Sequence, residues 1–399
     1  MNCELLSPAG DMECLKTAFR FGADAVYLGG RMLQLRAEKA AFSDAMLEEA
    51  VNYTHGIGKR LYVTLNSFVK NSEIGPLGEY ARWLRDTGTD AVIVSDLGAL
   101  AAVKAAAPGF AVHISTQANC CNYMAARTYY DMGAERVVLA RELSIDEIAE
   151  LRVLTPPDLE LEAFVHGAMC MAYSGRCLIS SYLNNRSGNR GECTQPCRWN
   201  YHLVEQKRPG EFFEVEEGGG YSAVLSSHDL NCISFLDKLC EAGITSFKIE
   251  GRMKTLYYVA TVTNAYRRRM DNTQTLAELE AELNSVSHRP YSSGFYFGEM
   301  KTNHNNDGGY RWDRVFIGVV KGCGRGRVSI EQRNSFAEGD GLEILSPDYF
   351  GAGFTARNIT DSAGQNVRQA SLVQGLYTMD CPYELHEGDI LRKRLTERG

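Results

Sequence analysis

The sequence predicts an α/β protein, with a (β/α)8-type parallel barrel followed by a small all-β barrel domain. Through the first 250 residues or so, short apolar runs alternate with longer stretches of helical spacing, an order typical of parallel strands joined by helical crossovers. After residue 315 the apolar runs are separated by turns such as Gly339-Asp340-Gly341, without a useful helical period. The dinucleotide fingerprint G-x-G-x-x-G does not follow the first apolar run, which argues against an open doubly wound sheet.

The barrel is predicted to occupy residues 1–300. Its strands are expected at residues 5–7, 25–28, 61–65, 91–94, 112–115, 137–140, 161–165, 223–225 and 246–249. Helical spacing follows the first strand over residues 11–21, and the next strands are also trailed by ten or more residues of helical character. Seven or more such units in succession favour a closed barrel over an open sheet.

The rest of the chain divides into segments of different character. Residues 205–221 are polar and glycine-rich and predict a surface excursion or hairpin, whereas residues 256–270 and 275–283 have helical spacing. Residues 301–313 are rich in Asn, Asp and Gly and predict a linker. Residues 314–399 predict the all-β domain, with strands at 316–320, 327–332, 342–345 and 390–392, in a barrel of about six strands.

The bulk composition limits the class of protein. A chain of 399 residues, 44% hydrophobic and 23% charged, is long enough for two or three domains and is ordinary for a globular protein. It has no run of 18 apolar residues, so no transmembrane helix is expected. The net charge of −8 argues against a protein that is basic all over, although RNA binding needs only a local basic patch. With no signal peptide before Met1, the twelve cysteines predict a cytoplasmic protein with reduced thiols.

Five cysteines define a cysteine-rich segment, residues 166–232. Cys170, Cys177, Cys193 and Cys197 fall within 28 residues, and Cys232 follows 35 residues later. The residues between the first four are rich in Gly, Asn and Arg, which build loops. Thiolates gathered on loops repel one another unless a metal ion or an iron–sulfur cluster supplies positive charge. The segment therefore predicts a metal site held by four thiolates.

The cysteine spacings leave the identity of the metal open. The spacings C-x6-C, C-x15-C and C-x3-C match neither paired C-x2-C zinc knuckles nor the ferredoxin run C-x2-C-x2-C-x3-C-P. They favour iron–sulfur over zinc only slightly. We interpret the other cysteines as buried thiols that pack as small hydrophobes or lie at the rim of a site. They are Cys3, Cys14, Cys120, Cys121, Cys240, Cys323 and Cys381.

Polar residues stand at the ends of the predicted strands, where parallel barrels carry their chemistry. These residues are Ser7, Asn66, Asp96, Ser115, Gln117, Arg141, Glu142, His166, Glu250 and Arg252. The cysteine-rich segment leaves the end of the seventh strand, so we expect it to roof the same face of the barrel, with Cys232 in reach.

Several distinctive motifs run in order through nearly the whole chain. They are ELLSPAGD beginning at Glu4, GADAVYLGG at Gly22, STQ at Ser115, VLARE at Val138, HGAMCMAYSGRC at His166, GNRGECTQPCR at Gly188 and KIEGRMK at Lys248. Together these motifs resemble peptidase family U32. Members of that family include prephenate-using hydroxylases of tRNA wobble uridine or of a ribosomal RNA cytidine, and enzymes that hydroxylate ubiquinone precursors without oxygen.

The resemblance implies a function, a cofactor and partners. It implies a [4Fe–4S] cluster on Cys170, Cys177, Cys193 and Cys232, with Cys197 as the alternative ligand. Zinc stays the alternative metal that the cysteine spacing leaves open. It implies an RNA-modifying enzyme that converts tRNA wobble uridine to 5-hydroxyuridine, with prephenate as the hydroxyl source. The tRNA branch is favoured because residues 287–298 and a C-terminal β-domain resemble it. The expected partners are tRNA or another structured RNA, a small dicarboxylate co-substrate and, as an option, a second U32 chain.

The catalytic candidates are His166, Arg141, Glu142 and Arg252, and each also has a structural interpretation. A lone histidine at a strand end is commonly structural, and Arg141 and Glu142 could simply pair with neighbours inside the barrel. Guanidinium groups bind carboxylates in bidentate fashion, so a dicarboxylate would need one or two of Arg141, Arg252 and Arg36.

The substrate-binding candidates are Asn66, Gln117, Arg36, Arg176 and Arg190. The last two arginines would meet RNA phosphates or offset the charge of the cluster. Many family members read Phe-Gly-x-Arg-Ala after the paired glycines, where this chain has Leu-Gln-Leu before Arg36, so the pocket near this loop is expected to differ. Two rival functions remain, a collagenase-like peptidase and a non-catalytic binding protein stapled by zinc.

Overall fold

The computed structural model describes residues 1–35, 41–170, 172–199, 203–204, 212–213, 228–298 and 310–395. These residues form two compact units. The first comprises Met1–Leu15, Ala23–Lys254 and His288–Tyr310, and the second comprises Lys16–Gly22, Thr255–Ser287 and Arg311–Gly399. No helix in the described ranges is both long and apolar enough to cross a membrane.

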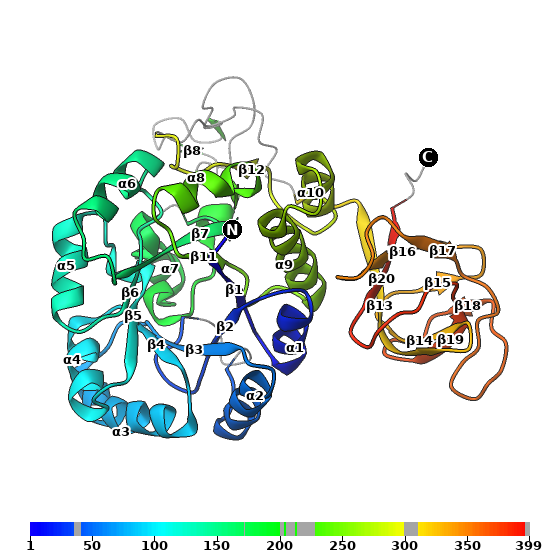
Figure 1. Cartoon of the computed structure of the whole chain (residues 1–399), viewed down its shortest axis with the longest axis horizontal. Helices are drawn as coiled ribbons and strands as arrows, with labels where there is room; N and C mark the ends of the chain where they lie inside the picture. The colour runs from blue at the N-terminus through cyan, green and yellow to red at the C-terminus, as the bar shows by residue number, and fades with distance from the viewer. Residues whose placement is uncertain are drawn as a thin grey trace. The chain divides into compact units, whose positions relative to one another are not determined.

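The first unit is a closed parallel barrel (Figure 1). Its strands, in order around the barrel, are β1 (Glu4–Pro8), β2 (Ala25–Gly29), β3 (Arg60–Leu65), β4 (Ala91–Val94), β5 (Ala111–Ile114), β6 (Arg136–Val138), β7 (Glu160–Ala168) and β11 (Ser246–Ile249). Strand β11 pairs in parallel with both β7 and β1, which closes the ring. The barrel predicted from the sequence is confirmed.

The strands form because their apolar runs are buried on both faces, as expected of a parallel sheet under helices. Every residue of β2 and β4 is buried. Inward-facing residues from neighbouring strands pack together inside the barrel, as Leu6, Tyr27, Tyr62 and Ile93 do.

Helices follow the barrel strands, and many begin at a side-chain cap. The helices are α1 (Met12–Arg20), α2 (Asp44–Gly56), α3 (Asn71–Thr87), α4 (Leu97–Ala106), α5 (Tyr123–Asp131), α6 (Ile145–Val153), α8 (Leu236–Glu241), α9 (Leu256–Asp271) and α10 (Leu276–Leu283). Ser43, Asp96, Asn122 and Ser144 each accept a backbone N–H at a helix start, which satisfies a donor that the helix itself leaves unpaired.

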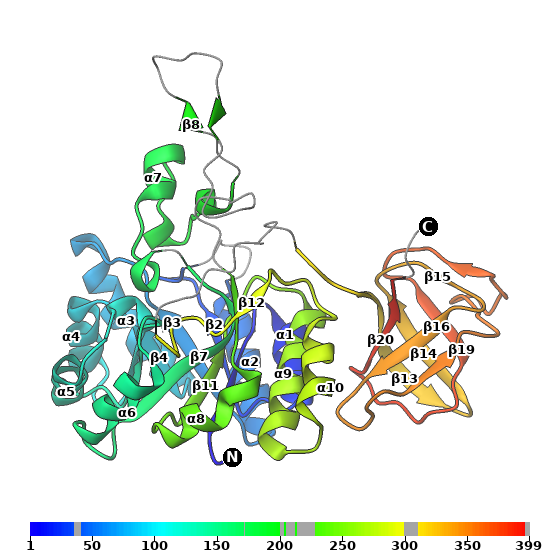
Figure 2. The same ribbon diagram turned by 90° about the horizontal axis from the view of Figure 1, so that it is seen from above.

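Beyond the barrel rim, β7 continues into a small accessory sheet that the sequence did not predict. Strand β10 (Asp229–Asn231) pairs antiparallel with the end of β7 and parallel with β12 (Tyr291–Ser292). This pairing explains why β7 runs three residues past its predicted end at residue 165. The expected strand at 223–225 lies outside the described residues. Figure 2 shows α7 (Ile179–Asn184) and the hairpin of β8 (Leu203–Val204) and β9 (Phe212–Phe213) projecting from the barrel end opposite the N-terminus.

The second unit contains α9, α10 and the C-terminal β-domain. Six strands pair antiparallel in the order β17 (Gly353–Thr355), β16 (Gly341–Leu345), β20 (Ile390–Arg394), β13 (Arg314–Gly324), β14 (Arg327–Gln332) and β19 (Leu376–Asp380). The sheet curves as a half-barrel around an apolar core that includes Ile317, Val328 and Phe336. A shorter pair, β15 (Phe336–Ala337) and β18 (Gln369–Ala370), completes the domain.

Candidate functional site

A cavity of about 60 Å3 lies inside the barrel among the strand ends, several times the roughly 10–15 Å3 that one water needs. Its polar lining comes from Thr64, Asn66, Ser115, Thr116, Gln117, Arg141, Lys248, Glu250 and Arg252, and its apolar lining from Tyr27, Leu35, Ile93, Val138 and Phe164. Four sequence-predicted candidates therefore meet in one place, namely Asn66, Gln117, Arg141 and Arg252. They come from the ends of different strands, as barrel geometry requires.

Arg252 is buried in this lining, with only 5% of its surface exposed. Its Nη1 donates to Thr64 Oγ1 at 2.9 Å, across the barrel mouth. Two glycines make room for it. A Cβ on Gly29 would stand 2.4 Å from Arg252 Nη1, and a Cβ on Gly10 would stand 2.4 Å from the Arg252 carbonyl oxygen. Both glycines belong to the motifs at the chain's start, so those motifs shape the place of this arginine.

Arg141 lies against Phe164, with the guanidinium carbon 4.0 Å from the ring centroid. Its Nη1 donates to the Ala168 carbonyl at 3.0 Å. Its Nε is buried and has no hydrogen-bond partner among the described residues. A buried charged donor without a partner is costly, so an anion bound in the cavity would gain by accepting from it.

Asn66 and Gln117 face the same cavity. Asn66 Nδ2 donates to Ser115 Oγ at 3.1 Å, while its Oδ1 is buried and accepts no hydrogen bond from the part of the chain that the structure describes. Gln117 is covered by the cysteine-rich segment, because a Cβ on Gly175 would stand 2.3 Å from Gln117 Nε2. Gly175 has a φ of +83°, a conformation that suits glycine. The segment thus lies on the cavity rim, as the sequence predicted.

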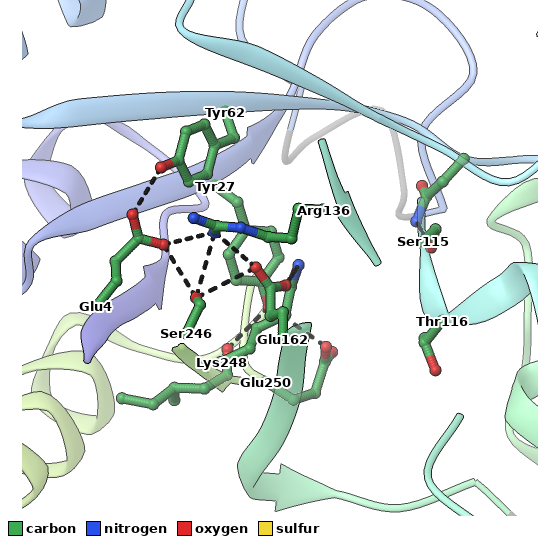
Figure 3. A network of polar contacts seen from close by, with 12 residues as sticks. Glu4, Tyr27, Tyr62, Ser115, Thr116, Arg136, Glu162, Ser246, Lys248 and Glu250 are labelled. Carbon is green, nitrogen blue, oxygen red and sulfur yellow. Dashed lines mark hydrogen bonds and ion pairs between the residues drawn. The ribbon is translucent and has the colours of Figure 1, made fainter. Parts of the chain in front are cut away.

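Lys248 was missed from the sequence, and it joins the cavity to a buried ion network (Figure 3). Its Nζ donates to Glu162 at 2.7 Å. Glu162 also accepts from Arg136 at 2.9 Å, and Arg136 donates to Glu4 at 2.6 Å. Burial lowers the pKa of Lys248, against the opposing effect of the Glu162 carboxylate. The sequence did offer a signal for this network, because each of four apolar strands contains a charged residue. Buried charges require partners, so these residues could have been expected to pair.

Glu142 and His166 lie outside the cavity lining. The Glu142 carboxylate accepts from the backbone N–H and the hydroxyl of Ser174, both at 2.6 Å, and so anchors the cysteine-rich segment to the barrel. His166 is buried, with its ring 5.3 Å from that of Tyr291. Burial lowers the pKa of His166 to about 3, so the imidazole is neutral at physiological pH.

The remaining arginine candidates have separate positions. Arg176 is exposed, and its Nε donates to the Gln117 carbonyl at 3.2 Å. Arg190 pairs with Glu73 at 2.7 Å and also donates to the Phe68 carbonyl, so it ties the cysteine-rich segment to the start of α3. Arg36 lies outside the described residues.

The cysteines of the described residues form no disulfide, and the sulfurs of Cys177 and Cys193 accept backbone hydrogen bonds. Cys177 Sγ accepts from the N–H of Ile179, and Cys193 Sγ accepts from the N–H of Gln195, both at 3.4 Å. Such N–H donors stabilise thiolates and tune iron–sulfur clusters. Cys170 is exposed just beyond β7, whereas Cys232 is fully buried after β10 and burial raises its pKa.

The spacing of possible metal ligands bears on a zinc site built from the cysteines. A zinc ion bound at about 2.3 Å would hold its thiolates about 3.8 Å apart. Within the described ranges, Asp348, His386 and Asp389 form the one group of three candidate ligand atoms that all lie within 4.8 Å of one another, and Arg20 pairs with both of those carboxylates. No three cysteine sulfurs of the described residues lie within 4.8 Å of one another. Thiolates that accept from backbone N–H groups are a donor set that iron–sulfur clusters use; the cluster itself stays a prediction.

Comparisons with known proteins cover nearly the whole chain. Residues 10–306 match the model of peptidase family U32, and residues 313–392 match that of the peptidase family U32 C-terminal domain. The chain is 33% identical to tRNA hydroxylation protein P of Escherichia coli, over 91% of this chain and 90% of that protein. It is 34% identical to tRNA hydroxylation protein P1 of Bacillus subtilis, over 98% and 94%. It is also 31% identical to a protein of Porphyromonas gingivalis named collagenase, over 79% of each chain.

Proposed function

The chain belongs to peptidase family U32, and from this membership and the cavity we propose that it is an RNA hydroxylase. Its substrate would be the wobble uridine of tRNA, converted to 5-hydroxyuridine with prephenate as the hydroxyl source. The names of the relatives in Escherichia coli and Bacillus subtilis support tRNA as the substrate class. The single observation that supports prephenate as the co-substrate is the group of positively charged side chains that line the barrel cavity.

The cavity suits a small dicarboxylate because it gathers Arg141, Arg252 and Lys248. Guanidinium groups recognise carboxylates through paired N–H donors. Within the described ranges, the buried Nε of Arg141 and the buried Oδ1 of Asn66 both lack a hydrogen-bond partner. A ligand with a carboxylate and a hydroxyl would satisfy both, and prephenate carries both groups.

The exposed surface of the cysteine-rich segment suits single-stranded RNA. Tyr173, Tyr182 and Trp199 are 52%, 87% and 44% exposed, and Arg176 is exposed beside them in the sequence. Bases in RNA loops stack on aromatic side chains, and arginines meet their phosphates. A wobble base already lies in a single-stranded loop, so it can enter a protein site without opening a duplex.

The proposed ligands of a [4Fe–4S] cluster are Cys170, Cys177, Cys193 and Cys232, with Cys197 as the alternative. When bound, such a cluster supplies redox-active or Lewis-acidic iron. Glu142 would position this cluster indirectly, because it holds Ser174 between the first two ligands.

The contacts of the described residues give little support to a peptidase mechanism. Nucleophilic catalysis needs a serine or cysteine hydrogen-bonded to a base. The hydroxyl of Ser174 donates to Glu142, and His166 is buried and neutral outside the cavity. The hydroxylase is therefore the function that we carry forward.

The proposed function is tested by mass spectrometry of tRNA nucleosides from a strain that lacks the gene. We expect 5-hydroxyuridine and its derivatives to be lost, to return with the wild-type gene, and to stay low with Arg141→Lys or Arg252→Lys. Unchanged hydroxyuridine in the deletion strain, with no second gene of this family present, would overturn the proposal.

A pair of neighbouring glycine variants tests the co-substrate site on purified protein. Gly29→Ala would push Arg252 Nη1 from its place, whereas the control Gly30→Ala would meet the Tyr80 hydroxyl, which is not part of the cavity lining. We expect Gly29→Ala to weaken prephenate binding about tenfold or more, the cost of one displaced charged hydrogen bond. Equal affinities of the two variants, at equal thermal stability, would contradict this role of Arg252.

A further inference from the structure

Two cysteines that the cavity does not use lie against each other near the start of the barrel. Cys3 Sγ is 3.2 Å from Cys240 Sγ, although 237 residues separate them in the sequence. Cys3 Sγ also contacts the Ile244 carbonyl oxygen at 3.3 Å. Both cysteines are partly buried, so each retains some access to small reagents.

The pair lies at the seam where the first barrel strand meets the last. Cys3 directly precedes β1, and Cys240 lies in α8, the helix that precedes β11. Across the seam, Glu4 pairs with Ser246 in register, and the Glu4 N–H donates to the Thr245 carbonyl at 2.9 Å. This parallel pairing holds the two sulfurs together whether or not they are bonded.

We propose that Cys3 and Cys240 form a reversible disulfide that staples this seam under oxidising conditions. A disulfide needs its sulfurs about 2.05 Å apart, so they must approach by only about 1 Å. The cysteine-rich segment projects from the opposite end of the barrel (Figure 2). The staple is therefore separate from the proposed cluster ligands and does not depend on the proposed function.

The chemistry is thiol–disulfide exchange with a small disulfide as the oxidant. One cysteine, as its thiolate, attacks the small disulfide, forms a mixed disulfide and releases one small thiol. The second cysteine loses its proton and displaces the other half as a second small thiol. Two electrons pass from the protein pair to the small disulfide, and a dithiol reverses the exchange. Burial, and then the hydrogen bond with Cys240, raise the pKa of Cys3 to about 12, so Cys3 is a thiol at neutral pH.

The test treats the full-length protein, with its metal retained, with oxidised glutathione under anaerobic conditions. After alkylation and digestion, mass spectrometry should find a Cys3–Cys240 cross-linked peptide, two hydrogens lighter than the sum of its parts, that disappears with dithiothreitol. The bond closes a loop spanning more than half the chain, so the melting temperature should rise by about 5 °C.

Matched variants separate the pair from the other thiols. Cys3→Ser and Cys240→Ser should each abolish the cross-link and the rise in melting temperature, whereas Cys14→Ser, which removes a buried cysteine of the same unit, should leave both. Full alkylation of Cys3 and Cys240 after oxidation, stable glutathione adducts on either, or cross-links of either to another cysteine would each overturn the proposal.

Discussion

Removing the Glu142 carboxylate should release the start of the cysteine-rich segment from the barrel. This carboxylate accepts two hydrogen bonds from Ser174 at 2.6 Å, a short distance that is typical of charge-assisted bonds. Ser174 itself has a φ of +40°, in the left-handed region that costs a non-glycine residue about 1 kcal/mol or more. The two bonds therefore stabilise a local conformation that the backbone alone disfavours.

The magnitude follows from these contacts. A hydrogen bond to a charged group contributes about 1.5–3 kcal/mol, and Glu142 is only partly buried, so we take the lower part of that range for each bond. The pair then contributes roughly 3–4 kcal/mol, which corresponds to a local opening equilibrium about 160- to 900-fold more favourable in Glu142→Ala. The opening should stay local, because the barrel strands keep their own hydrogen bonds.

Amide hydrogen exchange measures this opening directly. In Glu142→Ala, exchange should accelerate over residues 172–177, where the N–H groups of Ser174, Gly175 and Arg176 are now hydrogen-bonded, while the barrel strands exchange as in the wild type. The matched control is Glu147→Ala, which removes a carboxylate that caps α6 through Ser144 and should accelerate exchange only at that helix. If Glu142→Ala leaves residues 172–177 protected while the control loosens α6, the anchoring role is wrong.

Two further predictions concern stability. Burial lowers the pKa of His166 to about 3, whereas the unfolded value is 6.5, so between these pH values the unfolded chain binds one more proton than the folded chain. The free energy of unfolding should therefore fall by up to about 1.4 kcal/mol for each pH unit below 6.5. Urea unfolding at pH 7, 6 and 5 should show this dependence on pH, and the dependence should be weaker in His166→Gln. Glu282→Ala should destabilise the second unit by about 3 kcal/mol, the lower end for breaking a buried ion pair. The buried Arg392 guanidinium would lose its two bonds to Glu282, at 2.6 and 2.8 Å, and keep Glu343 at 3.2 Å as a carboxylate partner. Glu282→Gln should cost less, and equal losses would show that charge is not the cause.

The sequence predicted the barrel well because its strands follow a local rule. A strand buried on both faces must be apolar throughout, and seven such runs with helical spacing between them are visible without any structure. The accessory sheet could not be predicted in this way. Strand β10 has three residues, two of them polar, and its Asp229 is held by Arg289 from a segment 60 residues away. Only the tertiary contact makes that segment a strand.

The site was predictable to the same extent. Asn66, Gln117, Arg141 and Arg252 converge because each follows a strand, and the rule that strand ends meet at one face of a parallel barrel brings them together. Lys248 lies inside a strand, and its partner Glu162 comes from another, so only closure of the ring shows that they pair. Glu142 also follows a strand, but its neighbour in space is the cysteine-rich segment, which no periodicity places.

The glycines of the family motifs give the strongest link between sequence and site. Gly10 and Gly29 both border Arg252, and Gly175 borders Gln117, each so closely that one added methyl group would approach its neighbour to 2.4 Å or less. At Gly10 the space is occupied by a backbone carbonyl, which cannot easily move, whereas at Gly29 and Gly175 the missing side chain leaves room for the end of a neighbouring side chain. Glycines of motifs that lie far apart in the sequence therefore surround two cavity side chains, Arg252 and Gln117. This close packing orders the Arg252 guanidinium before a ligand binds. Preorganised donors bind a carboxylate without the entropic cost of ordering a long side chain.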